Sequence, residues 1–234
     1  MPAILRRDGS ELRIAIVVPT LDEEVAASRL LAEAARHGDE LVVSDGGSRD
    51  RTVEIAREVG ARVVAGAPGR GGQLNRGAAA AGGDVLVFLH ADTRLPEGAA
   101  EAIRAAVGGG AVGGGFRVRF DDAGMLYRFG AGVANLRARW TRLPLGDHAQ
   151  FVTRAAFEQL GGFAEWPILE DVDFMRRLRC VGRIAVLDPP VVTSARRFHT
   201  SGPIRTVARN WLIWTLFTLG ISPTRLARLY RDVR

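Results

Sequence analysis

Three short apolar runs in this chain each end on an acidic turn, and this repetition constrains the fold more than any other feature. The runs and their acids are 14–18 before Asp22, 41–43 before Asp45, and 85–89 before Asp92. Continuous apolar runs separated by helical stretches are typical of buried parallel strands. Because the carboxyl ends of parallel strands lie on one edge of a sheet, we expect the three carboxylates to line one crevice.

Strands and helices alternate through the first 107 residues, which predicts an α/β fold with right-handed crossovers. We expect a Rossmann-like, mostly parallel sheet flanked by helices, in a single domain over 1–234. Its parts are a nucleotide-binding half (1–115), an acceptor half (116–200) and C-terminal helices (201–234). The expected strands are 14–18, 40–44, 62–65 and 84–90, and the expected helices are 23–36, 50–59, 73–81 and 96–107.

The pattern changes after residue 108. A glycine-rich connector (108–115) is expected to lead into a strand at 116–120. The next helix, 124–142, carries large apolar residues at helical spacing, which predicts that most of them lie in the core. The remaining expected strands are 150–153 and 184–187, and the remaining expected helices are 154–160, 171–180, 204–219 and 223–231.

Composition excludes several kinds of chemistry. All 32 basic residues are arginine, which rules out a Schiff-base lysine and a P-loop lysine. The one cysteine, Cys180, allows no internal disulfide and favours a reducing, cytoplasmic location. The net charge of +6 suggests anionic partners. No feature other than the charge favours nucleic acid, so the expected partners are nucleotide phosphates or a membrane surface. Arginines spread over a solvated surface explain the charge equally well.

The turn after the first strand lacks the glycine fingerprint of a dinucleotide fold. Thr20, Asp22 and Glu23 stand there, and their side chains and charge suit a base N–H or a ribose hydroxyl better than a pyrophosphate. Asp45 ends the second strand, where a carboxylate can accept from a ribose. Taken singly, Asp22 is better explained as a helix cap, and Asp45 as the start of an Asx turn. Together on one edge, they favour a binding site.

Two further segments carry candidate phosphate and metal chemistry. The glycine-rich segment 68–77 is a weak match to a phosphate loop in which Arg70 could supply charge, and a loop with a solvated arginine explains it equally well. His90 and Asp92 lie two apart on an extended segment and therefore point to the same side. A carboxylate there can bind Mg²⁺ or Mn²⁺ together with diphosphate oxygens.

The pair Glu170-Asp171 begins an amphipathic helix. Acidic residues in a first turn complement the helix dipole, and Asp171 could instead serve as a general base for an acceptor hydroxyl. His199 is a candidate second metal ligand, although most isolated histidines are not ligands.

Taken together, these motifs resemble the family 2 inverting glycosyltransferases of the GT-A fold, and most closely a small stand-alone bacterial branch. The matching stretches span residue 14 to about 200: 17–24, 45–50, 71–75, 90–92, 146–147 and 170–171. The resemblance implies nucleotide contacts at Pro19, Thr20, Asp22, Glu23, Asp45, Gly46, Arg70, Gln73, His90 and Ala91. It also implies metal ligation by Asp92 and His199, acceptor contacts at Asp147 and Gln150, and catalysis by Asp171 beside Glu170.

The implied activity is transfer of a sugar, with inversion and metal assistance, from a UDP- or GDP-linked donor to an acceptor hydroxyl. His90 departs from the family pattern, because it replaces the first aspartate of the D-x-D motif. A sugar-phosphate nucleotidyltransferase is the alternative enzyme, but this chain lacks its G-x-G-T-R turn and its lysine. A non-catalytic module that binds nucleotide sugars or lipids is the alternative outside enzymes.

The stretch 211–221 combines tryptophans with nearby arginines. It is shorter than the roughly 20 apolar residues that a spanning helix needs. Tryptophan beside arginine on an apolar helix is typical of membrane interfaces, and a helix packed on the acceptor half or in a dimer explains it equally well. The hypothesis is peripheral contact with the inner face of the membrane and a lipid-linked acceptor.

Overall fold

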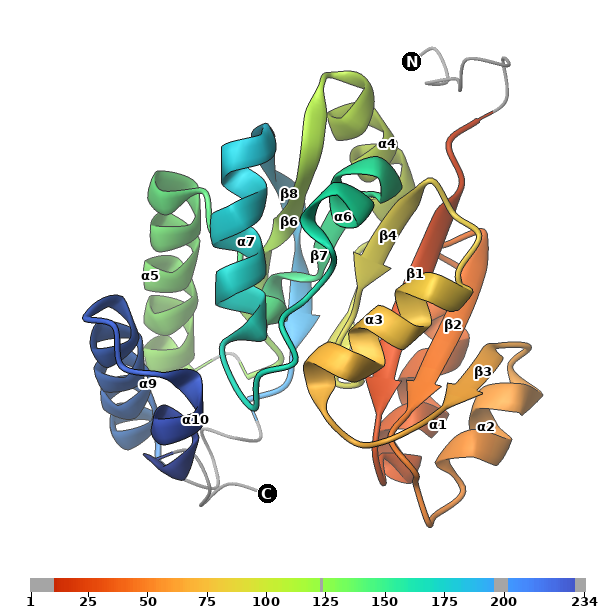
Figure 1. The fold of residues 1–234 in the computed structure, drawn as a ribbon, viewed down its shortest axis with the longest axis horizontal. Coiled ribbons are helices and arrows are strands. Elements are labelled where there is room, and N and C mark those ends of the chain that lie inside the picture. Colours follow the sequence, from red (N-terminus) through yellow and green to blue (C-terminus); the bar gives the residue numbers. More distant parts are fainter. Residues whose placement is uncertain (1–10, 123, 196–201, 230–234) are drawn as a thin grey trace.

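The computed structural model describes residues 11–122, 124–195 and 202–229 (Figure 1). At its centre lies one eight-stranded sheet with the order β3-β2-β1-β4-β7-β6-β8-β5. The first four strands in that order are mutually parallel, whereas β7 is antiparallel to both of its neighbours. The strands are β1 (Ile14–Thr20), β2 (Glu40–Asp45), β3 (Arg62–Ala65), β4 (Val85–Phe88), β5 (Thr93–Arg94), β6 (Ala111–Phe120), β7 (Gln150–Thr153) and β8 (Arg183–Thr193).

Helices cover both faces of the sheet, as expected for strands that are apolar on both sides (Figure 1). Alternate residues of β1 enter two separate cores: Ile16 packs with residues of α1, α2 and α4, and Val17 packs with residues of α3, α6 and α7. The helices are α1 (Glu24–Ala34), α2 (Thr52–Glu58), α3 (Arg70–Ala80), α4 (Ala99–Gly108), α5 (Met125–Thr141), α6 (Arg154–Leu160), α7 (Glu170–Val181), α9 (Pro203–Thr218) and α10 (Pro223–Leu226), with short 3₁₀ helices η1 (Gly146–His148) and η2 (Ala227–Leu229).

The register brings the predicted turns together. Thr20 at the end of β1 pairs with Asp45 at the end of β2, and Val17 pairs with Phe88 at the end of β4. The three acidic turns therefore leave the sheet at the same edge. The prediction of a mostly parallel sheet flanked by helices is confirmed.

The glycine-rich connector predicted at 108–115 is wrong for most of its length, because β6 begins at Ala111. The glycines of this strand allow close backbone packing. A Cβ on Gly114 would lie 2.0 Å from the carbonyl oxygen of Ala185 on β8, and one on Gly113 would lie 2.6 Å from that of Phe151 on β7. Glycine here marks crowding between strands, which the sequence pattern alone reads as a loop.

Other boundaries shift by a few residues. Helix α3 begins at Arg70, inside the segment predicted as a loop, and α4 begins at Ala99 rather than at residue 96. Strand β8 continues to Thr193, beyond the predicted 184–187. The last predicted helix (223–231) is α10 followed by η2 over the residues that the structure describes.

The prediction that the large apolar residues of α5 lie in the core is wrong. Phe129 and Trp140 are 71% and 82% exposed, and the other three residues predicted in the core are exposed as well, namely Leu126, Val133 and Leu136. Met125, at the start of the helix, is 85% exposed. Ala131 and Ala138, which are small, face inward instead, together with Asn135. The Asn135 amide donates to the carbonyl oxygen of Val118 and accepts from its N–H, so a polar side chain fixes α5 against β6. The helical spacing correctly predicts an apolar face but not the side of the helix that is buried.

Across the described ranges, no helix has both the length and the hydropathy needed to traverse a bilayer.

Candidate active site

The turns after β1 and β2 brace one another through side chain to backbone hydrogen bonds. The Asp22 carboxylate accepts from the N–H of Arg49 at 2.8 Å, and the Ser48 hydroxyl accepts from the N–H of Asp22 at 2.9 Å. Glu23 donates its N–H to the Thr52 hydroxyl at 2.9 Å. Asp22 has φ +52°, a conformation that non-glycine residues rarely adopt and that the surrounding contacts must hold.

Asp45 is buried between these two hydrogen-bonded turns. One carboxylate oxygen accepts from the N–H groups of Gly47 and Ser48 at 2.8 and 2.9 Å, and the other accepts from the hydroxyls of Ser48 and, at 3.3 Å, Thr20. Burial raises the pKa of Asp45, but these hydrogen bonds outweigh it and hold the pKa below its ordinary value. The carboxylate is therefore charged, and its longest bond is the one to Thr20.

Gln73 on α3 joins the ends of the first two strands. Its amide nitrogen donates to the carbonyl oxygens of Thr20 and Ser44 at 2.8 and 2.9 Å. A Cβ on Gly46 would lie 3.1 Å from that nitrogen, which explains the small residue there. Pro19, half-buried, immediately precedes this junction. The Gln73 donors thus hold the turn together, and contact of Gln73 with a nucleotide stays a prediction.

Arg70, the first residue of α3, connects this turn region to the second half of the chain. Its Nε lies 3.1 Å from Glu170 Oε1, and its Nη2 contacts His90 Nε2. Glu170 is almost fully buried, and burial raises its pKa above the ordinary value while the Arg70 guanidinium lowers it in part. One arginine thus bridges the histidine after β4 and the acid that begins α7.

Asp171 lies beside this bridge and is held by backbone donors. Its Oδ2 accepts from the N–H of Gly146 at 2.7 Å, and its Oδ1 accepts from that of Val172 at 2.8 Å. A Cβ on Gly146 would lie 2.5 Å from Arg70 Nη2, 2.8 Å from His90 Nε2 and 3.0 Å from Asp171 Oδ2. Gly146 therefore lies where three predicted site residues converge.

Sequence reasoning missed two residues of this region, Arg137 and His148. Burial lowers the pKa of Arg137, and the carboxylates of Asp171 and Asp147 partly oppose that shift, so the guanidinium is near both. His148 is buried with Nδ1 2.7 Å from the carbonyl oxygen of Phe116, and burial lowers its pKa to about 4. No motif marks Arg137, whereas the neighbouring pair Gly146-Asp147 could have pointed to His148.

The predicted acceptor residues lie at the same place but differ in exposure. The Asp147 side chain is largely exposed, with Oδ1 4.0 Å from His90 Nε2. Gln150 is buried at the start of β7 and donates to the carbonyl oxygen of Pro144 at 2.8 Å. Asp147 is therefore the more accessible of the two to an incoming acceptor.

The turn after β4 holds the candidate metal donors. Ala91 is half-buried against the core, and Asp92 is half-buried beside it. Among the described residues, no group of three or more His, Cys, Asp or Glu side chains could hold a metal. The Asp92 carboxylate still fits a cation such as Mg²⁺ or Mn²⁺, which keeps waters and takes phosphate oxygens as its other ligands. His199, the second predicted ligand, lies outside the described residues.

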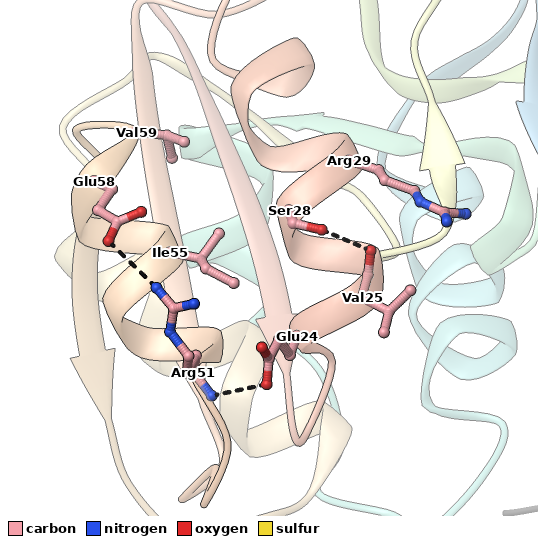
Figure 2. A pocket seen from close by; sticks show the side chains of 8 residues that line it. All are labelled: Glu24, Val25, Ser28, Arg29, Arg51, Ile55, Glu58 and Val59. Atoms are coloured by element: carbon pink, nitrogen blue, oxygen red, sulfur yellow. Dashed lines mark hydrogen bonds and ion pairs between the residues drawn. The ribbon is translucent and has the colours of Figure 1, made fainter.

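A groove of about 430 Å³ lies on the outer side of the braced turns, between α1 and α2 (Figure 2). Its walls include Glu24, Arg51 and Glu58 but none of the predicted site residues. We therefore locate the candidate site by the convergence of Arg70, His90 and Asp171 rather than by this groove.

Comparison with known proteins assigns the chain to a family. The model of the family described as Glycosyl transferase family 2 matches residues 15–154, which is more than half of the chain. Among curated proteins, no match to the chain was found.

Solved structures match over most of the chain. Residues 1–349 of S. aureus TarS align at a TM-score of 0.60 and 17% identity, over 93% of this chain and 69% of that one. Glucosyl-3-phosphoglycerate synthase from Mycobacterium tuberculosis with Mn²⁺, UDP and phosphoglyceric acid aligns at 0.61 and 24% identity, over 90% and 80%. The same synthase with Mg²⁺ and UDP aligns at 0.54 and 25% identity, over 78% and 70%. These matches establish the GT-A fold.

Proposed function

Because the chain belongs to glycosyl transferase family 2, we propose that it moves a sugar from a nucleotide-diphosphate donor to an acceptor hydroxyl with inversion. The chain is a glycosyltransferase, which sets aside the nucleotidyltransferase and the non-catalytic module. The observation that carries the proposal is the Asp171 carboxylate, oriented by the Gly146 N–H beside the Arg70–His90 pair.

The nucleotide binds at the braced turns, with Thr20, Asp22, Glu23 and Asp45 around the base and ribose. Asp45 is charged, and its 3.3 Å bond to the Thr20 hydroxyl is the one that a ribose hydroxyl or base N–H replaces. UDP is the first donor nucleotide to test, because the synthase structure at 25% identity contains UDP, and GDP is the second.

The diphosphate lies toward Arg70 and His90. The Arg70 guanidinium supplies positive charge at the N-terminus of α3, where backbone N–H groups also favour an anion. When bound, Mg²⁺ or Mn²⁺ held by Asp92, with His199 as the second predicted ligand, would offset charge on the departing diphosphate.

Asp171 is the general base. Hydrogen bonds from the N–H groups of Gly146 and Val172 hold its carboxylate in one orientation. As the acceptor oxygen attacks the anomeric carbon from the face opposite the nucleotide, its proton moves to Asp171 and the bond to the diphosphate oxygen breaks. Glu170, held by Arg70, fixes the start of α7, and thereby the position of Asp171.

The acceptor approaches past Asp147, near Gln150 and Arg137. A lipid-linked acceptor reached from the inner face of a membrane, with the protein in the cytoplasm, is part of this proposal. It is supported by the tryptophans and arginines of α9.

The test is release of UDP or GDP from a panel of sugar nucleotides, with Mn²⁺ or Mg²⁺, by the wild type and by Asp171→Asn. We expect Asp171→Asn to lose about 10³-fold in turnover while its affinity for the nucleotide stays unchanged. Asp173→Asn is the matched control, because Asp173 lies in the same helical turn but binds Arg177. Wild-type turnover in Asp171→Asn, or no release from any donor by the wild type, would contradict the proposal.

A further inference from the structure

The outer faces of α5 and α9 form a surface outside the residues proposed to bind the nucleotide and to catalyse transfer. Met125, Phe129 and Trp140 on α5 are mostly exposed, and their spacing of four and eleven residues places them along one stripe of the helix. Trp211 and Leu212 on α9 are also about half exposed. Large apolar side chains gathered in this way mark a contact site rather than ordinary surface.

The two helical faces are continuous. Trp140 of α5 and Trp214 of α9 line one groove of about 270 Å³, which Arg176 and Arg179 of α7 also border. The ring of Trp211 contacts that of Trp214 edge-on at 6.2 Å, so the exposed tryptophan of α9 adjoins the groove. Figure 1 shows α5 and α9 at the same end of the molecule.

The two segments that form this surface are rich in positive charge. The segments 125–142 and 203–229 contain eight arginines and no aspartate or glutamate, whereas the whole chain has a net charge of +6. The rest of the chain is therefore net negative. Arg128 and Arg139 are exposed and lie eleven residues apart, close to three helical turns, so they share one margin of the apolar stripe.

We propose that the α5–α9 surface docks on an anionic lipid bilayer. Exposed tryptophan and phenylalanine rings suit the boundary between head groups and acyl chains, and arginines bind the lipid phosphates. The same charge disfavours a second copy of this chain as the occupant, because an isologous contact would oppose two acid-free, arginine-rich faces.

Docking has a consequence that rests on the proposed function. Helix α5 also carries Arg137, whose guanidinium lies near Asp171 and Asp147. A bilayer on the outer face of α5 therefore lies next to the acceptor side of the site and could present an acceptor embedded in it.

The first experiment measures binding of the full chain to vesicles of phosphatidylcholine with phosphatidylglycerol, and to phosphatidylcholine alone, by flotation. We expect the double variant Phe129→Ser and Trp140→Ser to bind the anionic vesicles at least about tenfold more weakly than the wild type. Val25→Ser is the control, because Val25 is 66% exposed on α1, far along the sheet from this surface, and it should bind normally.

The second experiment tests whether arginine charge contributes to vesicle binding. Its result does not depend on whether the Phe129 and Trp140 double variant folds. Arg128→Gln with Arg139→Gln should weaken binding about fivefold for each arginine at low salt. Arg36→Gln with Arg57→Gln removes the same charge from exposed positions at α1 and α2 and should leave binding unchanged.

Docking would be overturned if the wild type did not bind anionic vesicles, or if both arginine double variants weakened vesicle binding equally. It would also be overturned if the wild type were a dimer in solution and the Phe129 and Trp140 double variant were a monomer. Release of nucleotide from the sugar donor in solution should be the same in all these variants. If the wild type showed no such activity, the proposed function would be contradicted but docking would not, because vesicle binding does not require catalysis.

Discussion

The turns after β1 and β2 and the outer face of α5 are opposite cases of how side chains are used. In the turns, the acidic side chains accept hydrogen bonds from other groups of the chain. Asp45 accepts four, and Asp22 accepts one from the neighbouring turn. On α5, the largest apolar side chains point to solvent and alanines face the sheet. The polar groups of the turns are hydrogen-bonded within the chain, whereas the α5 face leaves large apolar side chains exposed to solvent.

The largest effect expected from this comparison is on stability, at a glycine of the sheet. Gly114→Ala places a methyl group 2.0 Å from the Ala185 carbonyl oxygen and should cost about 3 kcal/mol of unfolding free energy. Gly132→Ala is the control in α5, where a Cβ meets open space, and should stabilise by about 0.5 kcal/mol. Urea unfolding measures both, and equal effects would show that β6 is not crowded.

The next effect concerns rate rather than stability. Gly146→Ala forces Arg70, His90 or Asp171 to move, so turnover should fall by about 100-fold while the melting temperature changes little. Steady-state kinetics with a calorimetric scan separates the two. Full activity in this variant would show that the convergence of these side chains is not needed for transfer.

A smaller effect is expected in the pH dependence of stability. The folded-state pKa of His148 is lowered from 6.5 to about 4, so the unfolded chain binds a proton that the folded chain does not. The unfolding free energy should fall as pH drops from 6.5 towards 4, by about 1 kcal/mol per pH unit at most. His148→Asn keeps a donor for the Phe116 carbonyl and should remove this slope. An unchanged slope would assign it to another group.

The smallest effect tests the exposed face directly. Phe129→Ala should change the unfolding free energy by less than about 0.5 kcal/mol, because the ring is mostly in water. Phe151→Ala, which empties a fully buried position on β7, is the contrasting control and should cost about 3 kcal/mol. Chemical denaturation gives both values. A large cost at Phe129 would mean that the face is buried in solution, for example against a second copy.

Part of the candidate site could be predicted from local pattern. Thr20, Asp45 and His90 follow apolar strands, and parallel pairing alone requires such residues to share an edge. Arg137 and His148 could not be found in this way. They belong to a helix and a short turn distant in sequence, and only the packing of α5 on β6 brings Arg137 near Asp171.

The sequence by itself determined the α/β alternation, the edge of the sheet at which the acidic turns gather, and the family resemblance. These features follow from short-range periodicity and from strand direction. Only the tertiary structure decided that the glycines of β6 are crowded strand residues, that Gln73 ties two strands, and that the apolar stripe of α5 faces outward. The physical reason is that a periodic pattern specifies that a helix has an apolar face, whereas burial depends on which other elements pack against it.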